Sequence, residues 1–359
     1  MSTPVCIVAT GARTPLGVGT AQSAAAVRAG ISRLAHHSLI SGKSGEPLPA
    51  AVDTALDPNI VGAARFVALA DTALREACAP LADSPIGQGI PLFLGLPEIR
   101  PGFSDADARV IRSNLARLEG LPVQILEVNV FNDGHAAGLL ALATATTQIR
   151  EGAYDVCLVG GVESYLNPET MNWLDANRQL TGPISRSGFV PGEGAGFCLL
   201  MSNDFSARRR FHSMAGVHSV EVGRETKLIK TSDLCLGEAL TTTVLSAVVG
   251  SGPTETIKTV ICDINSERYR TEEWAFVCLR LPQCFEDPTA YLSPADCWGD
   301  LGAASGPLFA MLSCQAIARG YAAGKRTLIW ASSEGGLRAA ATLDFEKAKP
   351  ASNRVIAHV

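Results

Sequence analysis

Short apolar runs alternate with helix-like segments along the first 200 residues. The runs are rich in Val, Ile and Leu and show little polar alternation, which is typical of strands in a sheet covered on both faces. One intervening segment has a clear start and stop, with Ser104 as N-cap, acids in the first turn and Gly120 at the end. We expect strands at 5–12, 90–96, 123–131 and 155–164, and helices at 19–31, 62–78, 104–120 and 136–150.

The same alternation returns after a stretch rich in Pro, Gly and Asn. Residues 188–200 ("GFVPGEGAGFCLL") are predicted to form a loop followed by a strand, and a second half begins near Ser206. This repeated order predicts an α/β protein with two related halves, residues 1–205 and 206–359. In the second half we expect strands at 212–223, 258–265 and 326–333, and helices at 234–250, 270–281 and 299–320.

The composition predicts a large folded core. Of the 359 residues, 47% are hydrophobic and 18% are charged, so the chain can bury much apolar surface. The net charge of -5, with no Lys/Arg cluster among aromatic residues, argues against a nucleic-acid-binding surface. No apolar run approaches the length of a membrane-spanning helix, and the N-terminus lacks the basic region of a signal peptide. We expect a cytoplasmic protein without a membrane partner.

The ten cysteines are scattered, mostly within apolar runs, and no CxxC pair occurs. We therefore expect reduced, buried thiols. The pair His36–His37 has no Cys nearby, and the glycine cluster 188–196 lacks the G-K-[ST] ending of a phosphate loop. These patterns predict neither a bound metal nor a cofactor.

Four stretches in a fixed order give the chain a family resemblance. They are "VATGARTPLGVGTAQSAAAVRAGIS", "IREGAYDVCLVGGVES", "SRSGFVPGEGAGFCLL" and "GDLGAASGPLFAML". They resemble the opening segment, the G-G-x-E strand, the G-E-G-A-G loop and the G-A-A-G helix of β-ketoacyl synthases in the thiolase superfamily. The resemblance implies a thiolase-like five-layer αβαβα fold of two pseudo-symmetric halves, and acyl-thioester chemistry. It also implies a homodimer in which the strand 125–131 pairs across the interface.

The residues that carry condensation in this family are replaced. Aligned from the G-G-x-E stretch, the acyl-accepting Cys falls on His135 of "HAAG", whereas Gly138 is retained. The first catalytic His of the family aligns with Glu267, and the second aligns with Gly299, next to Asp300. A Lys that is often near this site is also missing. Condensation by the family mechanism is therefore not expected.

An imidazole at a helix N-terminus behaves differently from a thiol. The helix dipole stabilises a thiolate but disfavours an imidazolium, so we expect His135 to be neutral at pH 7. A neutral imidazole can act as a base, but an acyl-imidazole hydrolyses readily. Three interpretations stay open: a space-filling residue bonded to backbone or to Asp133, a general base or relay with Glu267 and Asp300, and a ligand-binding group without turnover.

Glu267 has two interpretations. It could orient His135 as a catalytic partner, or it could be a solvated loop carboxylate paired with Arg268 or Arg270.

A further carboxylate, Glu334 of "SSEGGLRAA", takes the place of a gating Phe in the family. A carboxylate is costly to bury beside an acyl tunnel unless it is paired, for example with Arg186 or Arg338. The candidate pocket residues are Gly299, Glu334, Gly335, Gly336 and Phe189.

Two functions are consistent with these replacements. The combined loss of Cys, both His and Lys, with the structural glycines kept, favours a catalytically degenerate synthase-like protein that serves as a scaffold, a partner protein or an acyl-group binder. The alternative is an acyltransferase, thioesterase or decarboxylase that acts on acyl thioesters with His135 and Glu267 as base and orienter. The expected partners are a second copy or an active homologue through 125–131, an acyl-CoA or acyl carrier protein, or a protein that the chain serves as an adaptor.

Overall fold

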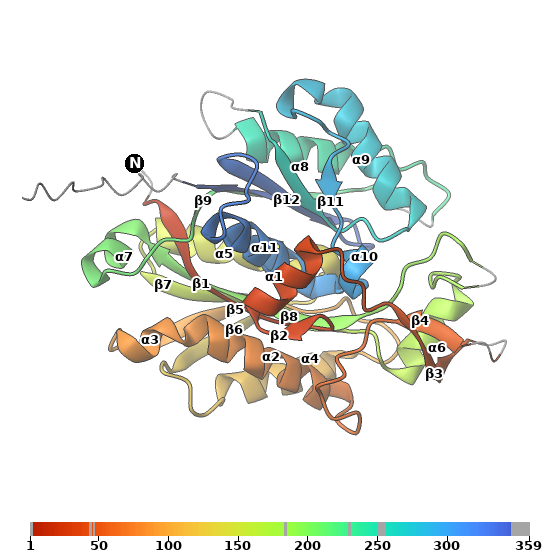
Figure 1. Cartoon of the computed structure of the whole chain (residues 1–359), viewed down its shortest axis with the longest axis horizontal. Coiled ribbons are helices and arrows are strands. Elements are labelled where there is room, and N and C mark those ends of the chain that lie inside the picture. The colour runs from red at the N-terminus through yellow and green to blue at the C-terminus, as the bar shows by residue number, and fades with distance from the viewer. Residues whose placement is uncertain are drawn as a thin grey trace, which may run out of the picture.

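The computed structural model describes residues 3–42, 45, 47–182, 185–228, 231–249 and 256–345, with the backbone alone at 38–41. Within these ranges the chain forms a mixed α/β protein with helices and strands in stacked layers (Figure 1). Residues 346–359 of the predicted second half, and Gly250 of a predicted helix, lie outside the described ranges. No helix in the described part is long and apolar enough to span a lipid bilayer.

Two sets of five strands, among the described residues, follow the same spatial order. The first set is β1 (Val5–Thr14), β5 (Ile90–Gly95), β6 (Ile125–Phe131), β7 (Val156–Ser164) and β8 (Glu193–Ser202). The second set is β9 (Ala215–Arg224), β10 (Thr259–Cys262), β11 (Tyr291–Leu292), β12 (Arg326–Ser332) and β13 (Leu337–Asp344). They lie in the order β6-β5-β7-β8-β1 and β11-β10-β12-β13-β9. Each set therefore places its third, second, fourth, fifth and first strand side by side.

Strand directions repeat as well. In each set the strand second in sequence pairs in parallel with the third and the fourth, and the fourth–fifth and fifth–first pairs are antiparallel. The two sets join where Val5–Ile7 of β1 pair with Ala215–Val217 of β9. The predicted pseudo-symmetry of the fold is confirmed. The boundary at 205/206 stays a prediction.

Helices form the three layers that alternate with the strands (Figure 1). The outer face of the first set is covered by α2 (Gly62–Cys78) and α4 (Asp105–Ala116), and that of the second set by α8 (Glu238–Val249) and α9 (Arg268–Arg280). Between the two sets lie α5 (Ala137–Arg150) and α11 (Ser305–Ala318), with α1 (Thr20–Arg28) beside α11. The predicted five-layer αβαβα fold is confirmed.

The two central helices are rich in small residues because they pack very closely. A Cβ atom on Gly138 of α5 would lie 2.4 Å from Cδ of Pro307, and one on Gly306 of α11 would lie 2.8 Å from Cγ of Leu139. Such distances leave no room for a side chain. The first ten residues of α11, 305–314, are all buried. This close contact brings the N-terminal ends of α5 and α11 together.

The helix predicted at 104–120 has the expected start. The Ser104 hydroxyl accepts a hydrogen bond from the Asp107 backbone N–H (3.3 Å), and the Asp107 carboxylate accepts one from the Ser104 backbone N–H (2.9 Å). This reciprocal pair satisfies two donors that the helix itself leaves free.

The helix predicted at 299–320 is interrupted. Gly299 (φ +75°) and Gly302 (φ +42°) have backbone conformations that end a right-handed helix. Within the predicted range the chain forms a 3₁₀ turn η3 (Gly302–Ala304) and then α11, and the short helix α10 (Ala295–Trp298) ends just before the range begins. The elements that were not predicted are β2 (Gly17–Val18), β3 (Ala35–Ser41), β4 (Pro47–Ala50), β11, β13, α3 (Pro80–Asp83), α6 (Pro168–Ala176), α7 (Asn203–Arg209), α10 and the 3₁₀ turns η1 (Gly134–Ala136) and η2 (Pro282–Cys284).

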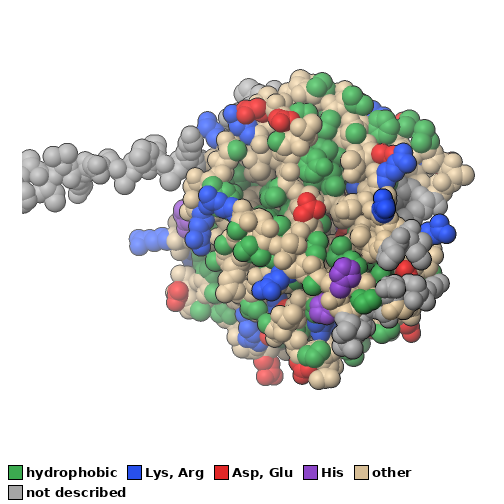
Figure 2. Space-filling model, turned by 45° about the vertical axis from the view of Figure 1, so that its right-hand side comes forward, with side chains coloured by type: hydrophobic (Ala, Val, Ile, Leu, Met, Phe, Trp, Pro, Cys, Tyr) green, Lys and Arg blue, Asp and Glu red, His purple; other side chains and the backbone are tan. Residues whose placement is uncertain are grey.

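Charged side chains occur in small groups over the surface. On the face drawn in Figure 2, Lys and Arg side chains lie among Asp and Glu side chains, and apolar side chains lie between them. This mixture follows from the near balance of 30 basic and 35 acidic residues in the sequence.

Candidate functional site

His135 lies in a tight turn between β6 and α5. The turn is a short 3₁₀ segment, η1 (Gly134–Ala136), and its first residue has a positive φ of +68°. A Cβ at Gly134 would also lie 3.1 Å from Cγ of Glu98, so glycine suits both the angle and the space. The His135 side chain is buried, with 8% of the residue exposed. The turn therefore directs the imidazole into the protein.

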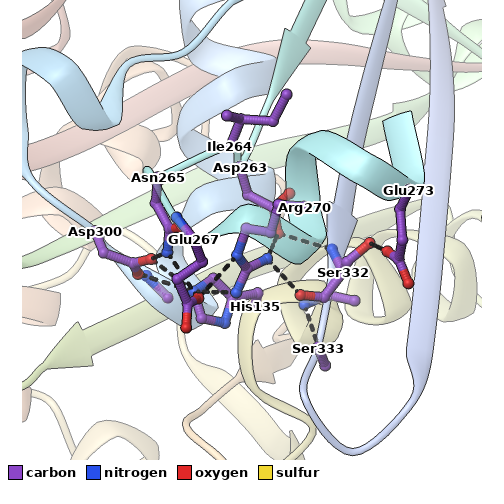
Figure 3. A network of polar contacts seen from close by, with 12 residues as sticks. His135, Asp263, Ile264, Asn265, Glu267, Arg270, Glu273, Asp300, Ser332 and Ser333 are labelled. Carbon is purple, nitrogen blue, oxygen red and sulfur yellow. Dashed lines mark hydrogen bonds and ion pairs between the residues drawn. The ribbon is translucent and has the colours of Figure 1, made fainter. Parts of the chain in front are cut away.

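Both polar partners of the imidazole come from the second half of the chain (Figure 3). Nε2 lies 2.9 Å from each carboxylate oxygen of Asp300 and 3.0 Å from Nη2 of Arg270. Asp300 precedes η3, and Arg270 belongs to the first turn of α9. The ring is thus held across the two halves, and the expected bond to Asp133 is wrong. The Asp133 carboxylate instead lies 3.5 Å from Nη2 of Arg224.

The contacts of this group raise the pKa of the imidazole. Burial and the Arg270 cation each act to lower the pKa of His135, but the charge and hydrogen bond of Asp300 outweigh them and raise it. Burial acts to raise the pKa of Asp300, but His135, together with Arg270 and Asn265, holds it well below its ordinary range. Asp300 thus shifts the pKa of His135 in the direction opposite to that expected from the helix N-terminus, and the neutral state of His135 at pH 7 stays a prediction.

Several donors saturate the Asp300 carboxylate. Oδ1 accepts hydrogen bonds from the Gly302 backbone N–H (2.7 Å) and the Tyr165 hydroxyl (3.1 Å), and Oδ2 accepts one from the Asn265 amide. Together with His135, these donors make Asp300 the centre of the network. A carboxylate with this many donors is stabilised in its ionised form.

The backbone fixes the position of Asp300. Its N–H donates to Val190 O (2.7 Å), and its carbonyl accepts from Gly192 N–H (3.0 Å). These bonds tie the 299–302 segment to the glycine-rich loop that precedes β8. At Gly299, a Cβ would lie 3.0 Å from both Ala51 Cβ and Val190 O. The pocket candidate Gly299 is therefore accounted for by its conformation and by close packing.

Arg270 joins the other carboxylates to the imidazole. Its guanidinium is fully buried. Nε lies 3.3 Å from Oε2 of Glu267, and Nη1 pairs with Asp263 and donates to Ser332 O (2.6 Å). Glu267 is itself buried, with 5% of the residue exposed. The interpretation of Glu267 as a solvated loop residue is thus wrong, and its pairing with Arg270 is confirmed. Glu267 is linked to His135 through Arg270, and also through Asn265 and Asp300 (Figure 3).

The remaining pocket candidates are accounted for by other contacts and by turn geometry. Gly335 N–H in the β12–β13 turn donates to the Glu98 carboxylate (2.8 Å), and the Glu334 carboxylate accepts from the Gln179 amide (2.6 Å). Gly336 has a φ of +99° that suits the same turn. Phe189 is buried and packs against Tyr165, with ring centroids 5.2 Å apart.

The basic residue suggested for Glu334 has another partner. Nη2 of Arg338 lies 2.5 Å from Oε1 of Glu273, and both side chains are buried. The pairing of Arg338 with Glu334 is therefore wrong.

Sequence reasoning missed several members of the network. Arg270 had been considered only as a surface partner, although its i,i+3 spacing from Glu267 is a usable signal. Ser333 was not singled out: its hydroxyl donates to Asp133 O and accepts from Ala136 N–H (2.9 Å). Asp263, Asn265 and Tyr165 carry no motif that would have indicated them.

No cysteine has the properties of a replacement nucleophile. Burial raises the pKa of all ten thiols, for example to about 12 for Cys198. A thiol with a raised pKa is a poor source of thiolate at neutral pH.

One group of side chains has the spacing of metal ligands. Glu225, Cys235 and Glu273 each offer an atom within 4.8 Å of the others in the described part of the chain. However, Glu273 is already paired with Arg338 and accepts from the Cys235 thiol (3.1 Å). Glu273 and Cys235 therefore already have partners within the protein.

Replacing Asp300 by Asn would remove the carboxylate charge that lies against His135. Because a buried pair that loses one partner leaves an uncompensated charge, we expect the free energy of unfolding to fall by about 3–5 kcal/mol, measured by urea unfolding. The matched control is Asp71→Asn, which breaks the exposed Asp71–Arg75 pair and should cost less than about 1 kcal/mol. Equal, small losses in both variants would contradict a stabilising role for the buried group.

Comparison with known proteins places this site within a recognised fold. Residues 134–205 match the family model of the β-ketoacyl synthase N-terminal domain. No curated protein matches the chain in sequence.

Three solved structures share the architecture. The ishigamide ketosynthase/chain length factor has a TM-score of 0.80 at 17% identity, covering 96% of this chain and 100% of that one. A chain from the complex of a type II polyketide synthase acyl-carrier protein with its ketosynthase has a TM-score of 0.79 at 16% identity, with the same coverage. The ketosynthase from module 6 of the bacillaene synthase of Bacillus subtilis 168 has a TM-score of 0.76 at 14% identity, covering 96% and 72%. The chain therefore has the thiolase-like fold of the β-ketoacyl synthases.

Proposed function

We propose that this chain is a catalytically degenerate β-ketoacyl-synthase-like protein that acts as a non-condensing partner or as an acyl-group binder. The observation that carries the proposal is that Nε2 of His135 is occupied, because it contacts both Asp300 and Arg270. A general base needs a free lone pair at the proton it removes. Because an ionised carboxylate only accepts hydrogen bonds, Nε2 donates its N–H to Asp300 and has no free lone pair.

The chemistry of acyl transfer is disfavoured on a second ground. A condensing or transferring enzyme of this fold needs an acyl acceptor at the nucleophile turn, and the side chain there is an imidazole. The Ser333 hydroxyl nearby is engaged with Asp133 O and Ala136 N–H. These contacts support a structural role for the side chains around His135, which come from both halves of the chain.

An altered acyltransferase, thioesterase or decarboxylase is the second candidate, and one observation favours it. An Asp beside a His is the arrangement that orients a catalytic imidazole, with one ring nitrogen held and the other free to react. The 2.9 Å contact between Asp300 and His135 has this form. In that case Nδ1 of His135 would be the base, and Asp300 in place of Glu267 would be the orienter.

The proposed partner surface is the edge strand β6. It is the last strand at one end of the sheet among the described residues, and Leu126 on it is 55% exposed. An exposed edge strand with an apolar side chain favours pairing with another chain. Two structures of the same fold are described as a ketosynthase/chain length factor and as a ketosynthase in complex with its acyl-carrier protein. By analogy, we propose a second copy or an active homologue at β6, and an acyl carrier protein or acyl-CoA as the thioester partner.

A direct test of activity uses acetyl-CoA, malonyl-CoA and hexanoyl-CoA with detection of free CoA. We expect no release above the buffer rate, because neither a nucleophile nor a free base is present at Nε2. The comparison variants are His135→Ala and, as a matched control, His212→Ala at an exposed position. Release by the native chain that falls about 100-fold or more in His135→Ala alone would overturn the partner-protein proposal and support the second candidate.

The partner surface is tested by placing a charge on it. Leu126→Lys should shift the assembly toward the monomer by at least about tenfold in dissociation constant, since a buried lysine would be unpaired at the interface, as measured by light scattering on a sizing column. The control is Leu279→Lys on α9, where the native side chain is 77% exposed. If both variants assemble as the native chain does, β6 is not the interface.

A further inference from the structure

A groove lies between α1 and the C-terminal end of α11, away from the His135 site. Its volume is about 270 Å³. Alanine methyl groups of α1 form its floor, and Arg28, Gln315, Arg319 and Tyr321 border it. The His135 group lies at the opposite, N-terminal end of α11, and a helix of this length spans roughly 20 Å. The groove is therefore a separate feature of the molecule.

Two similar helix endings build the groove. At the end of α1, Gly30 (φ +67°) lets Ile31 N–H donate to Ala26 O (3.0 Å). At the end of α11, Gly320 (φ +71°) lets Tyr321 N–H donate to Ala316 O (2.9 Å). In this motif a left-handed glycine turns the chain back over the last helical turn. The second ending brings Tyr321 back toward α1.

Two arginines border the groove beside Tyr321. The Cζ atom of Arg28 lies 4.0 Å from the centre of the Tyr321 ring. Arg319, two residues before Tyr321, lines the same groove. Neither arginine forms an ion pair with a carboxylate in the part of the chain that the structure describes. No acidic residue borders the groove either.

Two other exposed arginines, Arg75 and Arg268, pair with acids one helical turn away. The groove thus combines unpaired guanidinium donors with a methyl-lined floor. Guanidinium groups bind carboxylates through paired, charge-assisted hydrogen bonds, and the methyl groups offer contact for a short apolar body. The volume of about 270 Å³ lies just below the range of about 300–1,000 Å³ for small-ligand sites, so the groove suits only a small ligand.

We propose that this groove binds a small organic carboxylate, with its carboxylate between Arg28 and Arg319 and its apolar body on the alanines of α1. The proposal does not depend on the function proposed for the His135 site. Arg28 and Arg319 also lie at helix C-termini, where a cation is favourable without any ligand. Binding, and not stability, must therefore be the readout.

The test is calorimetric titration of the full chain with hexanoate, with hexylamine as the ligand of matched size and opposite charge. We expect hexanoate to bind at least about tenfold more tightly than hexylamine. Arg28→Gln and Arg319→Gln should each weaken hexanoate binding by at least about fivefold, since each removes one cation. Ala25→Leu should abolish binding because the larger side chain fills the groove without changing its charge.

Two controls show whether the binding site is this groove. Arg112→Gln on α4 removes an exposed arginine elsewhere and should leave the affinity unchanged. His135→Gln should also bind hexanoate normally. The proposal is overturned if hexanoate does not bind at millimolar concentration, if hexylamine binds equally well, or if Ala25→Leu binds like the native chain. Thermal unfolding of every variant confirms that a loss of binding is not a loss of folding.

Discussion

The constraint on which the site depends is the burial of several ionisable side chains at the junction of the two halves. His135 comes from the turn before α5, whereas Asp300 and Arg270 come from the second half. Each charge would cost several kcal/mol to bury alone, so these side chains can be buried only as a group. This requirement links the turn at Gly134, the helix break at Gly299 and the start of α9.

The same group has a direct consequence for chemistry. A thiol in the nucleophile turn could remain free to react, whereas the imidazole there is tied to a carboxylate and a guanidinium. Glu267, which might have oriented it, contacts Arg270. The fold thus keeps the architecture of a ketosynthase while the charges at its centre are satisfied by one another. We propose that this group has a stabilising role, and that this role replaces the one that the resemblance implies for these positions.

Much of the fold could be predicted from the sequence because it depends on local patterns. The apolar runs predicted the buried strands. Ser104, followed by acids in the first turn, predicted the capped start of α4. The position of His135 at the start of α5 followed from the motif order. Short elements such as β11 and the β3–β4 hairpin carry too little periodicity to be recognised.

The site was less predictable because its chemistry depends on distant partners. The pKa of His135 is raised by Asp300, which lies 165 positions away in the sequence. The helix N-terminus alone suggested a shift in the opposite direction. Arg270 was visible only as a neighbour of Glu267, and Tyr165 gave no signal although its hydroxyl contacts Asp300.

The most direct test of the central claim is a pH titration of the His135 ring by nitrogen NMR, with His135→Gln to assign its signals. Because Asp300 raises the pKa of His135, the imidazolium should persist above its ordinary midpoint of about 6.5. We predict a midpoint above that value in the native chain. A ring that is neutral at pH 6.5 and loses its proton at a lower pH would show a free base at this position, and would contradict the account.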